Sequence, residues 1–326
     1  MNKIKLVDCT VRDGGHLNNW DFSAECVKES YDVACRSNID FFEIGYRNYE
    51  NANYGKFYSC DDNFLMDVIQ PNENCKIAVM ADMTKSDINL FKTCDKNVTP
   101  ISAVFVATYL KDLEESFIFC EKLFDKGYMV FLNLMAIYDY TDKDFEILKE
   151  WKNKHILESV CFADSFGSFL PDDVENIYNR LKLSGFKNIS FHSHNNIQMA
   201  FANTLKAMDL GFYSVDASVY GMGRDAGNLP MELLLYYLNK FNENYNPIHY
   251  LKLIEKYYLD MHNKLNWGYN VYSFLGGIKN IHPKYIKELS QSGNIEKICY
   301  AADLLKQNNV TAYNKSELDK ILLNQN

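Results

Sequence analysis

The stretch SVCFADSFGSFLPDDVENIYNRLKLSGFKNISFHSH (residues 159–194) contains two short apolar runs on either side of a longer amphipathic segment. The runs 159–165 and 188–194 are typical of buried strands, and 171–183 has the apolar spacing of a helix. A strand, a helix and a second strand in this order form a right-handed βαβ unit with parallel strands. The stretch therefore predicts an α/β fold.

The same alternation continues on both sides of this unit, over most of the chain. The expected strands are 4–10, 40–46, 76–82, 101–108, 129–137, 159–165, 188–194 and 214–221. The expected helices are 23–37, 84–95, 112–126, 142–153, 171–183, 197–210 and 229–241, with Ser23, Asp112 and Thr141 as caps. Eight strands are the number that closes a barrel, so we predict a (β/α)8 TIM barrel, with a doubly wound sheet as the alternative.

The strand rhythm stops after residue 240, where the chain becomes rich in Tyr, Asn and Lys at helical spacing. We therefore expect a catalytic barrel domain over 1–240 and a helical C-terminal extension over 241–326 that completes the active site. Several apolar faces in this extension could support a homodimer.

Composition narrows the classes of partner. The chain of 326 residues is 47% hydrophobic and carries a net charge of −9, with no cluster of basic residues, so neither nucleic acid nor an anionic membrane is expected as a partner. The N-terminus has no apolar core of signal-peptide length, and the longest apolar segments are too short to span a membrane, so we expect a cytoplasmic protein. Nine cysteines without a CxxC pair indicate reduced thiols.

Polar residues interrupt the apolar strands at one end. They are Asp13, Glu43, Asp82, Asn133, Asp164, His192, His194 and Asp216, all in or just beyond the C-terminal halves of their strands. The carboxyl ends of the strands in a TIM barrel form the rim where active sites are built. The sequence thus predicts an active site at this rim.

The segment FHSHNN (191–196) carries the most specific chemical signal. Side chains two apart on a strand point the same way, so His192 and His194 share a face. Strand 1 closes the barrel next to strand 8, which brings Asp13 into the same sector. Two imidazoles and a carboxylate form a ligand set for a divalent cation. The alternative is a pair of hydrogen-bonded core histidines.

Three other segments add to this interpretation. The segment VRDGGH (11–16) predicts a turn that places a cation, an anion and an imidazole close together, directly after the first strand. The glycine-rich segment 220–234 suits either a phosphate site or a tight turn. Lysine is absent from strand 6 and from the ends of the other strands, which argues against a Schiff-base mechanism and for a metal as electrophile.

Several motifs together resemble the superfamily of metal-dependent aldolases and lyases that includes hydroxymethylglutaryl-CoA lyase, isopropylmalate synthase and 4-hydroxy-2-oxovalerate aldolase. These motifs are DCTVRDGGH (8–16), DSFGSFLP (164–171), HSHNN (192–196) and VDASVYGMGRDAGNLPMELL (215–234). The likeness is closest to the 4-hydroxy-2-oxovalerate aldolases, because His16 stands three residues after Asp13. NANYGKF (51–57) and WGYNVYSFL (267–275) are similar to further segments of those aldolases.

This resemblance implies a class II, pyruvate-type aldolase that cleaves or forms a 4-hydroxy-2-oxo acid through a metal-bound enolate. It implies the following roles: Asp13, His192, His194 and Asn228 as metal ligands, Arg12 on the enolate, His16 as general base and Tyr269 as a further catalytic group, with Tyr272 as the fallback. We expect Asp164, Ser165, Asn133 and Tyr54 to bind the substrates, a 2-oxo acid and an aldehyde. Mn²⁺ or Mg²⁺ is the expected metal, with Co²⁺ or Zn²⁺ as alternatives.

The chain also departs from the aldolase pattern. The segment 276–289 does not continue it, and that region is where those aldolases dock an aldehyde dehydrogenase, so such a partner is doubtful here. Residues 46–62 are rich in Tyr and Asn and suggest a more polar substrate. Two other hypotheses stay open: an acyl-CoA-dependent Claisen enzyme or lyase of the same superfamily, and a catalytically silent barrel subunit.

Overall fold

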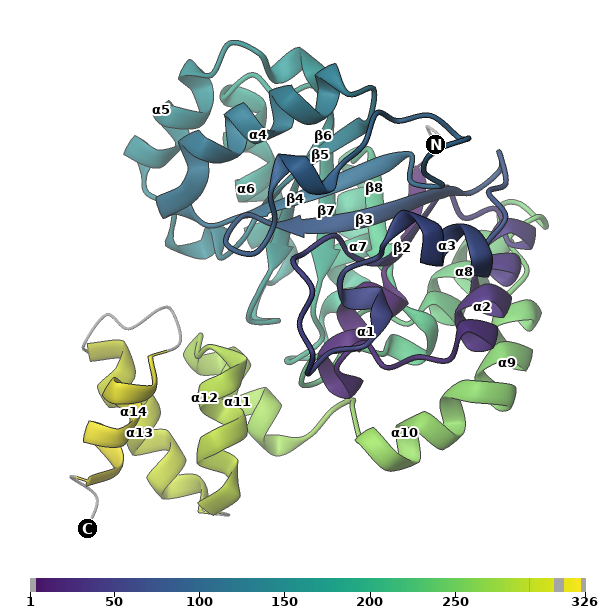
Figure 1. Cartoon of the computed structure of the whole chain (residues 1–326). Helices are drawn as coiled ribbons and strands as arrows, with labels where there is room; N and C mark the ends of the chain where they lie inside the picture. Colours follow the sequence, from purple (N-terminus) through teal and green to yellow (C-terminus); the bar gives the residue numbers. More distant parts are fainter. Residues whose placement is uncertain (1–3, 293, 308–313, 324–326) are drawn as a thin grey trace.

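The computed structural model describes residues 4–292, 294–307 and 314–323, and it shows a closed barrel of eight parallel strands surrounded by helices (Figure 1). The strands pair in sequence order, and β8 closes on β1. They are β1 (Lys5–Asp8), β2 (Phe41–Tyr46), β3 (Lys76–Asp82), β4 (Ala103–Thr108), β5 (Met129–Leu134), β6 (Leu157–Asp164), β7 (Ile189–Ser193) and β8 (Ser214–Ala217). The TIM barrel predicted from the sequence is confirmed.

Helices follow the strands and cover the barrel. They are α1 (Thr10–Asn18), α2 (Ala24–Arg36), α3 (Asp62–Val68), α4 (Leu113–Asp125), α5 (Asp142–Glu150), α6 (Pro171–Leu183), α7 (Ala200–Asp209) and α8 (Met231–Asn239). Ser23 caps α2 by accepting a hydrogen bond from the Cys26 amide, and Thr141 forms a capping box on α5. Asp112 precedes α4 without a capping bond from its side chain.

The helix predicted for 84–95 is wrong, since this segment contains only a short 3-10 turn, Ile88–Leu90. The carboxylate of Asp82 accepts the amide of Thr84, and that of Asp87 accepts the amide of Asn89. Such local bonds offer the backbone an alternative to the helical pattern.

The turn predicted for VRDGGH is also wrong, because these residues lie within α1. The two glycines concealed the helix, since glycine is a poor helix former. Packing explains one of them: a Cβ on Gly15 would lie 2.1 Å from the Trp20 ring. Because the segment is helical, Arg12, Asp13 and His16 project from one turn and a half of helix beneath the barrel rim.

The C-terminal helices fall into two parts. The first, α9 (Ile248–Leu253) and α10 (Leu259–Leu265), packs on the barrel, where the Tyr258 hydroxyl lies 2.9 Å from Ser30 Oγ and Tyr250 donates to Asp8 at 2.8 Å. The second part has a small apolar core of its own and lies beside the barrel in Figure 1. It consists of α11 (Val271–Lys279), α12 (Pro283–Leu289), α13 (Ile295–Gln307) and α14 (Lys315–Leu323). The domain boundary at residue 240 stays a prediction.

No helix in the described part of the chain combines the length and the apolar character that crossing a membrane requires. All nine cysteines carry free thiols.

Candidate functional site

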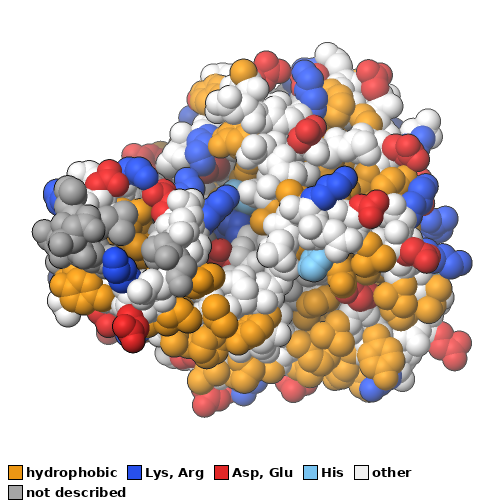
Figure 2. All heavy atoms as spheres, turned by 90° about the horizontal axis from the view of Figure 1, so that it is seen from below, with side chains coloured by type: hydrophobic (Ala, Val, Ile, Leu, Met, Phe, Trp, Pro, Cys, Tyr) orange, Lys and Arg blue, Asp and Glu red, His pale blue; other side chains and the backbone are white. Residues whose placement is uncertain are grey.

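A cavity of about 470 Å³ opens at the carboxyl ends of the strands. Every strand, or the segment directly after it, contributes to its wall, and His282 and Lys284 from the C-terminal helices add to it. Figure 2 shows this face hollowed between the C-terminal helices and the barrel, with Lys and Arg side chains on both sides of the hollow. The rim that the sequence predicted as the active site is therefore the place of a well-formed cavity.

Asp13, His192 and His194 meet at the floor of this cavity. One ligand atom from each lies within 4.8 Å of the other two, and all three residues are buried. His192 Nδ1 lies 2.9 Å from Asp216 Oδ2, whereas the buried His192 Nε2 has no hydrogen-bond partner. A carboxylate that holds one ring nitrogen of a histidine and leaves the other bare is the usual arrangement behind a metal ligand. The donor set fits a divalent cation.

Asn228 lies beside Asp13, in the loop after β8. Its Nδ2 donates to Asp13 Oδ2 at 2.9 Å and to the Met222 carbonyl at 3.1 Å, while its buried Oδ1 has no partner. A Cβ at Gly223 would lie 2.6 Å from Asp13 Oδ2 and 2.5 Å from Asn228 Nδ2, so only glycine fits here. The glycine-rich loop thus holds the Asn228 amide against the Asp13 carboxylate, and Asn228 Oδ1 remains without a hydrogen bond.

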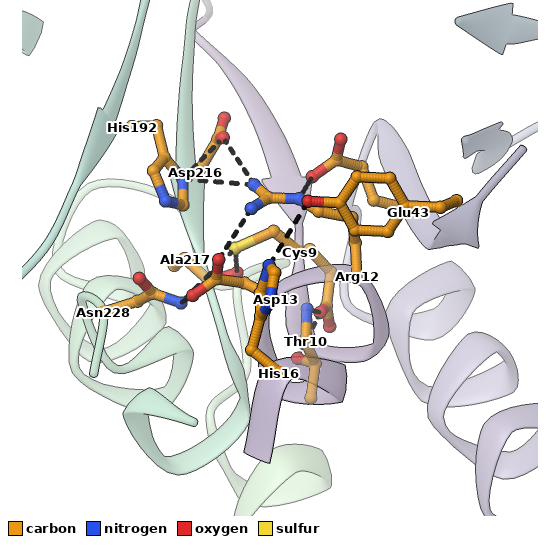
Figure 3. A network of polar contacts seen from close by, with 12 residues as sticks. Cys9, Thr10, Arg12, Asp13, His16, Glu43, His192, Asp216, Ala217 and Asn228 are labelled. Atoms are coloured by element: carbon orange, nitrogen blue, oxygen red, sulfur yellow. Dashed lines mark hydrogen bonds and ion pairs between the residues drawn. The ribbon is translucent and has the colours of Figure 1, made fainter. Parts of the chain in front are cut away.

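Arg12 is held by carboxylates on several sides (Figure 3). Its Nε donates to Glu43 at 2.9 Å and its Nη1 to Asp13 at 2.8 Å, and its Nη2 lies 4.0 Å from Asp216. Arg12 is only 4% exposed, but it lines the cavity. These contacts fix the cation in place before any ligand arrives, which is what electrostatic stabilisation of a developing anion requires.

The carboxyl groups around Arg12 differ in charge. Burial by itself raises the pKa of Asp13, but Arg12, with His194 and Arg224, outweighs it and holds this pKa well below its usual range. Burial raises the pKa of Glu43 and that of Asp216 to about 7, although Arg12 opposes the shift in both. Asp13, the carboxylate in the ligand set, is therefore the most firmly ionised of the three.

The imidazoles of the site are neutral. Burial, with the charge of Arg12, lowers the pKa of His192 to about 3, and burial lowers the pKa of His194 well below its usual value. A histidine must be neutral to bind a metal. The two rings stand nearly perpendicular, with centroids 4.9 Å apart.

His16 lies on the cavity wall, on the next turn of α1 from Arg12 and Asp13. Its Nε2 is 3.4 Å from the Tyr46 hydroxyl, and its ring packs edge-on against Trp20 at 4.7 Å. Burial, together with the charge of Arg224, lowers the pKa of His16 to about 3. The ring is thus neutral near pH 7 and can accept a proton.

Only some of the other predicted site residues line the cavity. Asn133 and Tyr54 line the cavity, and the buried Asn133 Oδ1 has no partner. Asp164 and Ser165 do not line it: Asp164 accepts the amides of Ser168 and Phe169, and Ser165 Oγ accepts the amide of Ala136. These bonds shape the loop after β6, so neither side chain faces the cavity in this structure.

The tyrosine expected from the C-terminal region lies elsewhere. Tyr269 is 59% exposed, and its ring contacts Phe274 at 6.3 Å. Neither Tyr269 nor Tyr272 lines the cavity, so the structure does not bring them together with His16. Tyr46 is the tyrosine next to His16.

Several residues of the cavity wall were not predicted. They are Asn19, Trp20, Tyr46, Tyr58, Met80, Lys85, Ala107, Tyr109, Met135, Ala163, Arg224, His282 and Lys284. The Tyr- and Asn-rich segment 46–62 and the Arg in GMGRDAGN were signals for Tyr46, Tyr58 and Arg224. His282 and Lys284 had none, because only the tertiary structure brings the C-terminal helices to the barrel mouth.

No lysine stands at the carboxyl end of a described strand, but Lys85 lies close to one. It stands three residues beyond β3, in the cavity wall, and its Nζ lies 2.6 Å from Asp82 Oδ2. Burial lowers the pKa of Lys85, but the Asp82 carboxylate outweighs this and raises it. A lysine that forms a Schiff base needs the opposite shift, so the argument against that mechanism stands.

Comparison with known proteins shows which proteins this chain resembles. Residues 141–255 match the family model described as HMGL-like. The chain is 29% identical over 246 residues to a 4-hydroxy-2-oxovalerate aldolase from Carboxydothermus hydrogenoformans, which covers 73% of this chain and 71% of the relative. It is 24% identical over 237 residues to an oxaloacetate decarboxylase from Mycobacterium tuberculosis, covering 72% of this chain and 70% of the relative.

A solved structure agrees with these relatives. The N-terminal domain of a protein provisionally assigned as an aldolase, from Bacteroides vulgatus, superposes with a TM-score of 0.75 at 29% identity. The superposition covers 88% of this chain and 96% of that domain. The motifs, the barrel and these comparisons agree that the chain is a carbon–carbon lyase, and it is similar to the HMGL-like superfamily and, within it, to the 4-hydroxy-2-oxovalerate aldolases.

Proposed function

We propose that the chain catalyses the reversible cleavage of a 4-hydroxy-2-oxo acid into pyruvate, or a related 2-oxo acid, and an aldehyde. The observation that carries this proposal is the meeting of Asp13, His192 and His194 within 4.8 Å, in the same cavity as Arg12 and His16. The relatives named 4-hydroxy-2-oxovalerate aldolase support the choice of reaction.

Asp13, His192 and His194 would hold a divalent cation, with the free Oδ1 of Asn228 beside them. Mn²⁺ or Mg²⁺ fits this mixed set, with Co²⁺ or Zn²⁺ as alternatives. When bound, such a cation supplies Lewis-acid stabilisation of negative charge on the keto oxygen.

Arg12 stabilises the same negative charge as the bond between C3 and C4 breaks. Its bonds to Glu43 and Asp13 hold the guanidinium still, so little reorganisation is needed during the reaction. A preorganised donor of this kind contributes about 3 to 4 kcal/mol.

His16 takes the proton from the 4-hydroxyl, so that the aldehyde carbonyl forms as the electron pair of the broken bond moves to C3. Its place on the cavity wall supports this role, and the ring is neutral and can accept a proton. Its pKa of about 3 makes it a weaker base than a free imidazole. The Tyr46 hydroxyl, 3.4 Å from His16 Nε2, orients the ring. That Tyr269 delivers the proton to C3 stays a prediction.

One screen tests the proposal. The metal-loaded protein is mixed with a panel of 4-hydroxy-2-oxo acids, including sugar-derived ones, and pyruvate release is followed with lactate dehydrogenase and NADH. We expect release from at least one member. No release from any of them, together with tight binding of an acyl-CoA in a titration, would favour the Claisen-type alternative instead.

Two controls separate the remaining alternatives. Borohydride with pyruvate should not label the protein, because Lys85 is paired with Asp82; stoichiometric labelling would mean a Schiff-base enzyme. Metal analysis of the purified protein should find a divalent ion. A protein that neither contains nor binds one would fit a silent barrel subunit.

A further inference from the structure

The proposed reaction needs a proton donor at C3 as well as a base at the 4-hydroxyl. When the bond between C3 and C4 breaks, the electron pair moves to C3, and C3 must take up a proton before the 2-oxo acid is complete. Tyr269, the residue expected for this step, is 59% exposed and does not line the cavity. The donor must therefore lie among the groups of the cavity wall.

Tyr46 is a tyrosine of that wall, placed directly beside His16. It is the last residue of β2 and is 8% exposed, yet it lines the cavity together with His16. Its hydroxyl lies 3.4 Å from His16 Nε2. The Tyr46 ring stands edge-on against Trp20, with ring centroids 5.4 Å apart, and this packing fixes the place of the hydroxyl.

The charges around the Tyr46 hydroxyl agree with a position at the reacting end of the cavity. Burial raises the pKa of Tyr46, Arg12 opposes the shift, and Asp13 adds to it. Burial also raises the pKa of Tyr58, another tyrosine of the wall, but the charge with the largest effect there is Lys85. Tyr46 therefore lies toward Arg12 and Asp13, and it carries its proton at neutral pH.

A tyrosine that holds its proton firmly needs a second group to replace the proton as it leaves. His16 can do this, because its ring carries the proton of the 4-hydroxyl at this stage and its Nε2 lies 3.4 Å from the Tyr46 oxygen. The pKa of His16 is about 3, so the protonated ring gives up its proton readily. The structure thus pairs a group that retains a proton with one that releases it.

We propose that Tyr46 is a further catalytic residue, which donates its hydroxyl proton to C3 of the 2-oxo acid and receives a proton from His16 in return. This inference rests on the proposed aldolase function and adds the proton donor to it. In cleavage, the 4-hydroxyl loses its proton to His16 Nε2, the electron pair of the broken bond moves to C3, and C3 takes the Tyr46 proton. The proton on His16 then passes to the Tyr46 oxygen. One proton has moved from the 4-hydroxyl to C3, and both residues return to their starting states.

Exchange of the pyruvate methyl hydrogens with D₂O isolates the C3 step, because it needs no aldehyde. The Mg²⁺-loaded protein is mixed with pyruvate in D₂O, and loss of the methyl signal is followed by proton NMR. Tyr46→Phe should slow the exchange by about 10²-fold, as expected for a lost acid–base group. Its affinity for pyruvate, measured by calorimetry, should stay within about threefold of wild type, because the hydroxyl acts in the transition state. Exchange at the wild-type rate in Tyr46→Phe would overturn the proposal.

Two other tyrosine variants accompany this one. Tyr140→Phe is the matched control, since Tyr140 is as buried as Tyr46 but does not line the cavity, and its hydroxyl has no hydrogen-bond partner among the described residues. It should exchange at the wild-type rate. Tyr269→Phe tests the competing assignment: a loss of exchange in this variant, with the wild-type rate in Tyr46→Phe, would give the step to Tyr269 and overturn the proposal.

The acidity of the ring separates proton transfer from simple orientation of His16. Either 3-fluorotyrosine or 3,5-difluorotyrosine in place of Tyr46 keeps the hydroxyl beside His16 but makes the phenol more acidic. The rate of a proton transfer depends on the acidity of the donor, so the exchange rate should change by more than about threefold across this series. One rate at all three acidities would mean that Tyr46 only orients His16, and it would overturn the proposal.

The wild-type protein separates this inference from the proposed function. Exchange in the wild type that is unchanged in Tyr46→Phe overturns the inference alone. If the metal-loaded wild type neither exchanges the pyruvate hydrogens nor releases pyruvate from any 4-hydroxy-2-oxo acid of the panel, the proposed function fails together with the inference.

Discussion

Replacing Asp216 with Asn should weaken metal binding strongly although Asp216 is not itself in the ligand set with Asp13. Asp216 Oδ2 lies 2.9 Å from His192 Nδ1, and the two residues are 1% and 3% exposed, so the bond is shielded from bulk water. An ionised carboxylate keeps the proton on Nδ1 and leaves Nε2 free. The amide group of Asn can donate to Nδ1 instead, which favours the tautomer with its proton on Nε2.

The magnitude follows from the role of such partners. Loss of a carboxylate behind a metal-ligating histidine costs about 10- to 100-fold in affinity, which is about 1.4 to 2.7 kcal/mol. We expect the upper end here because the pair is fully buried. Calorimetric titration of the chelator-treated protein with Mn²⁺ measures it. The affinity of the wild-type protein should also fall as the pH drops through about 7, where Asp216 takes up a proton.

Glu43→Gln is the matched control for this variant. Glu43 is as buried as Asp216, also has a pKa of about 7 and binds Arg12 at 2.9 Å, but it does not contact His192. Its replacement should change the Mn²⁺ affinity less than about threefold. Wild-type affinity in Asp216→Asn, or an equal loss in both variants with the fold intact by circular dichroism, would refute the reasoning about the tautomer.

Three further predictions concern the same cavity. His16→Ala should lower turnover by roughly 10² to 10⁴ while Mn²⁺ affinity stays within a few-fold of wild type, and unchanged turnover would remove His16 as the base. Because His16 protonates below about 6.5 when unfolded but only near about 3 when folded, it makes the free energy of unfolding fall as the pH falls between these values. In urea titrations at pH 4 to 6, His16→Asn should therefore show a slope smaller by up to about 1.4 kcal/mol per pH unit, whereas an unchanged slope would mean that His16 is protonated in the folded state. Treatment with EDTA should abolish pyruvate release and Mn²⁺ should restore it; full activity in metal-free protein would contradict a metal-dependent reaction.

Much of the fold could be predicted because local sequence patterns carry it. The apolar runs and the helical spacing between them have periods set by backbone geometry, so they marked all eight strands and most helices. The prediction of secondary structure was wrong in two segments, where individual side chains matter more than the periodic pattern. In 84–95, Asp82 and Asp87 bond to nearby amides. In 10–18, two glycines conceal a helix, and one of them, Gly15, admits the Trp20 ring.

The candidate site was predictable where it depends on strand geometry. His192 and His194 share a face because they are two apart, and the closure of β8 on β1 brings Asp13 toward them. Asp164 and Ser165 were predicted because they lie at a strand end. Their position in the sequence does not reveal that their side-chain oxygens accept hydrogen bonds from backbone amides.

The sequence by itself determined the barrel and the identity of the groups on its floor, since both follow from short-range periodicity and from motifs at strand ends. Only the tertiary structure decided how those groups are charged and what surrounds them. The charge states of Asp13, Glu43 and Asp216 depend on one buried guanidinium that all three share. Lys284 lines the cavity because helices some 200 residues after β3 pack against the barrel, and no local pattern encodes such a contact.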